Sequence, residues 1–398
     1  MPLSRPTSSF FDAKYAGLPA SAPFDSLPFL TKAELVADQA EHPPYGTRLD
    51  RPAGDYVRLH QTSGTTTGKP LVMLDTAEGW DWLLDCWMAG FKLAGIAPSD
   101  RLFFPFSFGP FLGFWTAFEA GLKHGNFCLT GGGMSTAARL NAIVDHAITV
   151  IFCTPTYALH LAEAAGKENI SLAASSVRKV VVAGEPGGSI PAVRARIESG
   201  WGAAVVDHYG LTEVGPTAFE PADGHGDLVV LDDKFFAEVI DRETLIPTPA
   251  GEIGELVLTN LGRVGNSVVR YRTGDLVRPA LERHPAGLRL LGGILGRADD
   301  MLHVRGNNLY PTAIEAIVRR FTQVVEYRLI VDDTGPLTDL RLDLECRSGD
   351  EGTTAEQVRR AIQSDLLFRV EVRLVPSGTL DRFEMKARRL VRIGKSYP

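Results

Sequence analysis

Five β-rich runs follow one another in the region that begins at Asp100: RLFFPF (101–106), NFCLT (126–130), TVIFCT (149–154), KVVVAG (179–184) and AAVVDHY (203–209). Helical stretches separate them, including YALHLAEAAGK (157–167) and IPAVRARIESG (190–200). Strands that alternate with helices form right-handed βαβ units, because each crossover must pack back onto the sheet. The sequence therefore predicts an α/β fold with a mainly parallel sheet.

The pattern changes on the carboxyl side of this region. Between Asp227 and Pro279, strand-like runs are joined by Pro/Gly turns with no helical stretch between them. These runs are DLVVL (227–231), FFAEVID (235–241), GELVLTN (254–260) and VVRYRTGDLV (268–277). We expect a β-rich subdomain here.

The last hundred residues have a pattern of their own. From about Arg297 the order is helix (312–323), strand (324–333), strand (340–347), helix (354–367) and strand (370–376). This length suffices for a small α+β domain. We therefore predict a large domain over residues 1–296, with a capping segment at 1 to about 55, and a small mobile domain over residues 297–398.

Composition limits the classes of function. A chain of 398 residues with 44% hydrophobic residues, a net charge of -7 and no long basic run is expected to bind neither nucleic acid nor membranes. The amino terminus lacks a leader pattern, and the four cysteines form no CxxC pair. We expect reduced core thiols, a cytoplasmic location and a monomer or homodimer with small-molecule partners.

Hydroxyl residues and glycines crowd ahead of a lysine in HQTSGTTTGKP (60–70), after the extended run DYVRLH (55–60). Glycine lets backbone N–H groups approach an anion, and the hydroxyls and the lysine add donors and charge. A flexible turn is the alternative. A Walker-type P-loop is excluded, because three residues separate the glycines and proline follows the lysine. The predicted phosphate-binding residues are Thr62, Ser63, Gly64, Thr65, Thr66, Thr67, Gly68 and Lys69.

Four motifs occur in a fixed order: TSGTTTGKP (62–70), HYGLTE (208–213), YRTGDL (271–276) and GRADDMLHVRGNNLYP (296–311). Together they resemble the adenylate-forming (acyl/aryl-CoA synthetase) superfamily, in particular its phenylacetate-CoA ligases. The runs CTPTYALHLAE (153–163) and VVAGEP (181–186) resemble the same branch. The resemblance extends from about Leu27 to the carboxyl end.

The resemblance implies roles for the nucleotide-binding residues. Tyr209 is expected to stack near adenine, Thr212 to contact the α-phosphate and Glu213 to hold Mg²⁺. Asp275 and Arg297 are expected to contact the ribose hydroxyls. For each residue alone, the alternative is an ordinary place in the core or on the surface. The remaining members of the predicted ATP/AMP-binding set are Gly184, Glu185, Pro186, His208 and Gly210.

The resemblance also implies a catalytic lysine and a hinge. Lys386, in TLDRFEMK (379–386), matches the position of the lysine that bridges the acid and the α-phosphate, where its positive charge can stabilise developing negative charge. The alternative is a solvated basic tail that contains Arg388, Arg389 and Arg392. Asp299 matches the position about which family members rotate the small domain.

Aromatic residues crowd the Gly/Pro-broken stretch FSFGPFLGFW (106–115) and favour an aryl acid as substrate. Core packing is the alternative for each of them. The predicted acid pocket consists of Phe106, Phe108, Phe111, Tyr157, His208 and Gly210, with Phe104, Phe114 and Trp115 nearby.

The implied reaction has two steps. The acid attacks the α-phosphate of ATP in the presence of Mg²⁺, and coenzyme A then takes the acyl group from the adenylate. A shorter chain and a glycine-poor lysine segment leave a carrier-protein phosphopantetheine or an amine open as the acceptor. A nucleotide-binding module without catalysis is a further alternative, and so is a kinase, which would form ADP instead of AMP.

Overall fold

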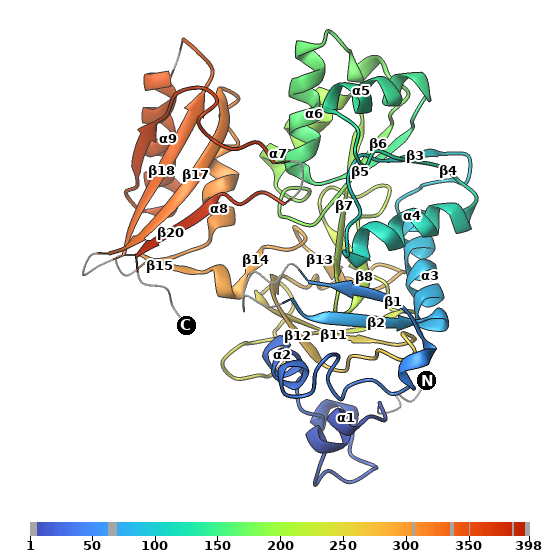
Figure 1. Cartoon of the computed structure of the whole chain (residues 1–398). Coiled ribbons are helices and arrows are strands. Elements are labelled where there is room, and N and C mark those ends of the chain that lie inside the picture. The colour runs from blue at the N-terminus through green and yellow to red at the C-terminus, as the bar shows by residue number, and fades with distance from the viewer. Residues whose placement is uncertain are drawn as a thin grey trace.

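The chain folds into a large body and a smaller carboxyl-terminal lobe (Figure 1). The computed structural model describes residues 6–62, 70–304, 307–334, 338–349, 351–383 and 386–394. In Figure 1 the lobe, orange to red, stands beside the body near α7. The α-helices are α1 (Ser9–Lys14), α2 (Lys32–Glu41), α3 (Ala77–Leu93), α4 (Leu112–His124), α5 (Thr136–Asp145), α6 (Pro155–Lys167), α7 (Pro191–Trp201), α8 (Pro311–Val318) and α9 (Glu351–Leu366).

The largest sheet has the strand order β13-β9-β8-β7-β6-β5-β3-β4. Its strands β3 to β7 pair in parallel, and β8, β9 and β13 continue the sheet antiparallel. The predicted α/β fold with a mainly parallel sheet is confirmed. The strands are β3 (Arg101–Phe104), β4 (Phe127–Thr130), β5 (Val150–Cys153), β6 (Lys179–Ala183), β7 (Ala204–Leu211), β8 (Gly215–Phe219), β9 (Leu228–Val230) and β13 (Arg289–Leu290).

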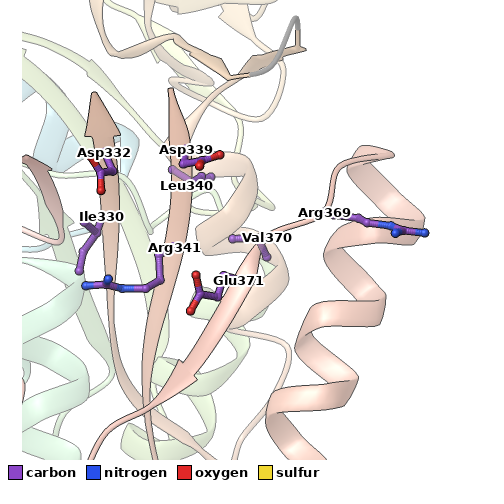
Figure 2. Close-up of a pocket in the computed structure, with 8 residues that line it drawn as sticks. All are labelled: Ile330, Asp332, Asp339, Leu340, Arg341, Arg369, Val370 and Glu371. Atoms are coloured by element: carbon purple, nitrogen blue, oxygen red, sulfur yellow. The ribbon is translucent and has the colours of Figure 1, made fainter. Parts of the chain in front are cut away.

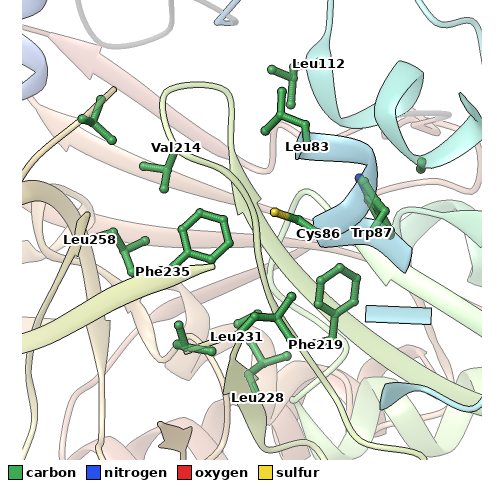
Figure 3. Packing of buried hydrophobic residues seen from close by; sticks show 14 of the residues in the cluster. Leu83, Cys86, Trp87, Leu112, Val214, Phe219, Leu228, Leu231, Phe235 and Leu258 are labelled. Atoms are coloured by element: carbon green, nitrogen blue, oxygen red, sulfur yellow. The ribbon is translucent and has the colours of Figure 1, made fainter. Parts of the chain in front are cut away.

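Alternate residues of the buried strands face two different hydrophobic cores. In β5, Val150 and Phe152 contact the core that contains α3 and α4 side chains, whereas Ile151 and Cys153 contact the core formed with α5, α6 and α7. Figure 3 shows part of the first core, where Trp87 of α3 lies near Phe219 of β8. The helices thus cover both faces of the sheet, which leaves its strand ends for a site.

Hydroxyl caps fix where several of these helices begin. Thr154 ends the run TVIFCT, and its Oγ1 accepts a hydrogen bond from the N–H of Tyr157 at 3.1 Å. Pro155 is the first residue of α6, where its missing N–H costs nothing. The cap therefore sets the chain entry of α6 directly after β5.

A second sheet, of order β10-β11-β12-β14, forms much of the β-rich region. One prediction here is wrong: DLVVL (227–231) contains β9, which pairs with β8 in the large sheet. All residues of β9 are buried there, so its apolar run is accommodated in that sheet. The strands of the second sheet are β10 (Phe235–Ile240), β11 (Gly254–Asn260), β12 (Tyr271–Val277) and β14 (Gly296–Arg297), and a separate hairpin consists of β1 (Tyr56–Gln61) and β2 (Val72–Thr76).

The lobe has a hydrophobic core of its own, which begins at Leu302 and includes residues of α8, α9, β17 and β18. The predicted boundary at 296/297 falls inside β14, which still pairs with β12, and it stays a prediction. The helix predicted over 312–323 ends early, at Val318. The strands are β15 (Leu302–Val304), β16 (Asn307–Leu309), β17 (Val324–Asp333), β18 (Asp339–Cys346), β19 (Glu371–Leu374) and β20 (Leu390–Gly394).

Candidate active site

The predicted site residues come together where strands end. Tyr209 lies in β7, Glu213 lies in the turn between β7 and β8, and Asp275 lies in β12. Lys386 reaches the same region from the lobe, since its charge interacts with those of both carboxylates. Ligands of open α/β sheets bind at the carboxyl ends of the strands. The predicted residues Ser63, Gly64, Thr65, Thr66, Thr67, Gly68 and Lys69 lie outside the described residues, whereas Thr62 exchanges hydrogen bonds with Leu71.

Asp275 is a buried carboxylate with several partners. The Tyr209 hydroxyl donates to its Oδ2 at 2.6 Å, and Arg297 Nη1 donates to its Oδ1 at 3.2 Å. Burial raises the pKa of Asp275 to about 6, and the charge of Arg297 opposes this rise. The preceding Gly274 has a φ of 75°, and a Cβ there would lie 2.9 Å from Arg297 Nη2. The glycine of YRTGDL is therefore needed for this packing.

Glu213 is the residue expected to hold the metal ion. It is 4% exposed, accepts a hydrogen bond from the Tyr271 hydroxyl at 3.3 Å and pairs with Lys32 Nζ at 3.0 Å. The described residues contain no group of three or more potential metal ligands. Mg²⁺ commonly takes one or two protein carboxylates, with phosphates and water as its other ligands, so a single carboxylate fits it.

Two residues that the sequence did not single out hold this turn. Arg263 is fully buried, pairs with Asp75 at 2.7 Å and donates to the backbone carbonyls of Thr212 and Glu213, both at 3.0 Å. The other is Lys32, which belongs to the segment for which no chemistry was predicted. No local pattern marks either residue, since both partners are distant in sequence.

Glu185 joins the body to the lysine segment of the lobe. Its Oε1 accepts the N–H of Thr156 at 2.8 Å, and its Oε2 accepts the N–H of Ala387 at 2.6 Å. Lys386 is an exposed residue, yet desolvation of its amine by the surrounding protein lowers its pKa, and Glu185 contributes most to the opposing attraction. A Cβ at Gly184 would lie 3.4 Å from Lys386 Cε. Glu185 is thus positioned beside the predicted catalytic amine.

The predicted acid pocket is only partly assembled. Phe106 packs against Phe114 with ring centroids 4.2 Å apart, and Phe108 lies 5.4 Å from Phe106. Phe111 contacts the same cluster through Phe114 at 6.0 Å. Phe108 and Phe111 remain partly exposed, so this cluster can present an aromatic surface. The aromatic residues therefore do come together between β3 and α4.

The other three members of the predicted acid pocket make contacts with the protein itself. Tyr157 is fully buried in the core between α5 and α6, where Arg139 donates to its hydroxyl, and its predicted polar contact with the acid stays a prediction. His208 is 7% exposed and stacks on Phe219, and burial lowers its pKa to about 3, which keeps it neutral. At Gly210 a Cβ would lie 2.8 Å from the Gly215 carbonyl oxygen.

Two cavities lie elsewhere. One, of about 290 Å³, lies on the lobe beside β17 and β18, and Figure 2 shows Asp332, Arg341 and Glu371 around it. The other, of about 600 Å³, lies between α6 and α7 of the body and the lobe. Neither lining contains a residue from the predicted site set.

The chain belongs to the AMP-binding enzyme family. Residues 21–262 match that family, and residues 306–392 match the family described as the AMP-binding enzyme C-terminal domain. The predicted membership of the adenylate-forming superfamily is confirmed.

Curated relatives are phenylacetate-coenzyme A ligases. The ligase of Thermus thermophilus is 32% identical, with 93% of this chain and 87% of that protein covered. The ligase of Escherichia coli is 31% identical, with 85% and 79% covered.

The solved structures include one ligase in two states. 2-Hydroxyisobutyryl-CoA ligase in the postadenylation state, in complex with 2-HIB-AMP, gives a TM-score of 0.91 at 25% identity and covers 98% of this chain and 86% of that one. In the thioesterification state, with 2-HIB-AMP and CoA, it gives 0.72 at 26% identity and the same coverage. The arrangement of this chain is therefore more similar to the postadenylation state. Among the described residues, no helix is long and apolar enough to cross a bilayer.

Proposed function

We propose that the chain is an AMP-forming acid-thiol ligase that activates an aryl or arylacetic acid with ATP and transfers the acyl group to coenzyme A. The observation that carries the proposal is the position of Lys386, whose amine is attracted by the carboxylates of Glu185, Asp275 and Glu213. The names of the relatives and the aromatic cluster around Phe106 and Phe108 support the acid class.

In the first step a carboxylate oxygen of the acid attacks the α-phosphorus of ATP, the bond from that phosphorus to the oxygen bridging to the β-phosphate breaks, and pyrophosphate leaves. Lys386 stabilises the charge that develops on the α-phosphate, and Thr212 is proposed to donate to the same group. Asp275, held by Tyr209 and Arg297, accepts hydrogen bonds from the ribose. Glu213 would hold Mg²⁺, which neutralises phosphate charge when bound.

In the second step the thiol of coenzyme A loses its proton to solvent, and its sulfur attacks the adenylate carbonyl. The carbon–oxygen bond to AMP breaks and AMP leaves. We propose that the lobe rotates near Asp299 between the two steps, because the thiol must reach the face that Lys386 covers. Asp299 lies in the short turn Ala298–Asp300, next to β14.

Acid-dependent exchange of labelled pyrophosphate into ATP tests the first step. A panel of benzoates, arylacetates and short fatty acids without a thiol should give exchange with an aryl acid. Exchange restricted to fatty acids would contradict the proposed acid class. Thioester formation is then measured with coenzyme A, a carrier protein and simple amines, and transfer to either of the last two alone would replace the proposed acceptor.

The proposed compartment is the cytoplasm, and the proposed assembly is a monomer or homodimer. The cysteines Cys86, Cys128, Cys153 and Cys346 are free thiols, as a reducing compartment favours. Burial raises the pKa of Cys153, so this thiol stays protonated.

A further inference from the structure

The cavity of about 600 Å³ between the body and the lobe is rich in guanidinium groups. Thr156, whose N–H is bonded to Glu185, lies at its edge, so the cavity starts just behind the lysine segment. Among the described residues, the carboxylates of its lining come from Glu163 and Glu326. The arginines that line it are Arg196, Arg319, Arg320, Arg347, Arg382 and Arg389.

Four of the six arginines that line the cavity form ion pairs with carboxylates of the described residues, and two do not. Within the described part of the chain, Arg196 of α7 and Arg347 after β18 have no ion pair. Glu163 pairs with Lys167 at 2.9 Å and is thus already occupied. The paired arginines are Arg389 with Glu326 at 2.7 Å, Arg319 with Glu326 at 3.3 Å, Arg320 with Asp365 at 2.5 Å and Arg382 with Glu345 at 2.5 Å.

Arg196 is in an unfavourable place for a lone cation. It is half-buried, and its hydrogen bond to the Val324 carbonyl oxygen is long, at 3.4 Å. Burial and the like charges of Arg319 and Arg347 lower its pKa to about 10. A buried guanidinium without a carboxylate is costly, so an anion placed here would relieve both desolvation and repulsion.

A buried donor at the same cavity also lacks a partner. Arg319 is 3% exposed, and its Nε makes no hydrogen bond within the described residues. The nearest carboxylate oxygen, on Glu315, is 3.7 Å away, which is too long for a hydrogen bond. The N–H is enclosed by protein, so Arg319 contributes its positive charge to the cavity, while its Nη atoms are bonded to the Val325 carbonyl oxygen and to Glu326.

We propose that this cavity is a second anion site, which binds a small phosphate-bearing molecule between Arg196 of the body and Arg319 and Arg347 of the lobe. Guanidinium groups match phosphate oxygens in geometry as well as charge. Because the two sides come from different parts of the molecule, the bound anion favours the lobe orientation seen here. The site is separate from the nucleotide site and does not depend on the proposed function.

Calorimetric titration of inorganic phosphate into the full chain tests this. 5′-O-Sulfamoyladenosine, which carries no phosphate, is present to occupy the nucleoside pocket. Arg196→Gln should weaken one phosphate-binding event by about tenfold or more, as expected for the loss of a charge-assisted hydrogen bond. Arg320→Gln is the matched control, because this arginine lines the same cavity but is paired with Asp365, and its affinity should stay within about twofold of the parent value.

Unchanged phosphate binding in both Arg196→Gln and Arg347→Gln would overturn the proposal. Titration with adenosine 3′,5′-bisphosphate shows whether the bound phosphate group belongs to a nucleotide or is free phosphate. Binding at least tenfold tighter than that of inorganic phosphate indicates a nucleotide. Equal binding indicates free phosphate. Pyrophosphate exchange by Arg196→Gln, measured without added phosphate, tests the proposed function separately.

Discussion

The body and the lobe hold their parts of the candidate active site in different ways. In the body, Asp275 is bonded to Tyr209 and Arg297, and the Glu213 turn is held through its backbone by the buried Arg263. In the lobe, the described residues next to Lys386 are bonded to the body through Ala387 N–H to Glu185 and through Arg389 to the Thr156 hydroxyl. The nucleotide half is held by more contacts than the lysine half, which we propose is withdrawn after adenylation.

The similarity to solved structures fits this division. The same 2-hydroxyisobutyryl-CoA ligase gives a TM-score of 0.91 in the postadenylation state and 0.72 in the thioesterification state, so the arrangement of this chain differs more from the latter. Residues of the body should therefore matter in both half-reactions. Residues that hold the lysine should matter only in adenylation.

The largest effect is expected from Lys386→Ala. Pyrophosphate exchange should fall by about 10²–10³-fold, the loss typical of one preorganised electrostatic donor. Formation of the thioester from supplied acyl-adenylate should change little, because the proposed rotation takes the lysine away from the site in that step. Arg388→Ala, an exposed neighbour, is the control for nonspecific effects on the segment. An equal loss in both half-reactions would show that Lys386 does not act in adenylation alone.

Asp275→Asn should have the next largest effect and should impair both half-reactions. Asparagine keeps an oxygen for the Tyr209 hydroxyl but loses the charge that pairs with Arg297, a loss of about 1.5–3 kcal/mol for a charged hydrogen bond. KM for ATP and KM for supplied adenylate should both rise by roughly tenfold or more. A rise in the KM for ATP alone would contradict a role of the body in both half-reactions.

Glu185→Gln should slow adenylation by roughly tenfold, because the bond to Ala387 N–H loses its charge. Thioester formation from supplied adenylate should stay at the parent rate. Glu185 raises the pKa of Lys386 against the effect of burial, so its removal should shift the alkaline fall of the exchange rate to lower pH. A loss of rate with the pH profile unmoved would point to a purely structural role.

The smallest effect concerns the stability of the body itself. Burial raises the pKa of Asp207 in β7 to about 7, while the Ser189 hydroxyl donates to it at 2.5 Å. The folded state therefore favours the protonated acid, and this contribution to stability is complete below about pH 4 and lost as pH rises through about 7. Urea unfolding should show Asp207→Asn to be less pH-dependent than the parent over this range. An unchanged pH dependence would exclude Asp207 as its source.

The parts of the fold predicted from the sequence are those with strong local patterns. The run VVEYRLIVDD coincides with β17, and GELVLTN coincides with β11, because both are rich in the β-branched and other apolar residues that favour strands. The strand β20 was missed, since Arg392 within it and Arg388 and Arg389 before it indicate a solvated tail, and most of its residues are exposed. It is a strand because it pairs with β17, and no pattern in its own residues predicts that pairing.

The same distinction applies to the candidate site. Motifs such as YRTGDL identified Asp275, but Arg263 and Lys32 escaped, because each meets the Glu213 region across a large sequence separation. Tyr157 was placed in the acid pocket through its motif, although helix α6 turns it into the core. The roles of the remaining site residues stay predictions until the variants are measured.

The strand β20 has a mechanical consequence. It begins four residues after Lys386 and is hydrogen-bonded to β17 over Leu390–Gly394, so the lysine cannot travel far without the sheet of the lobe. Withdrawal of the amine therefore requires the whole lobe to move through the solvent. If this movement limits turnover, the steady-state rate will fall in inverse proportion to solvent viscosity. The rate of pyrophosphate exchange will not depend on viscosity in this way, because exchange needs no movement of the lobe.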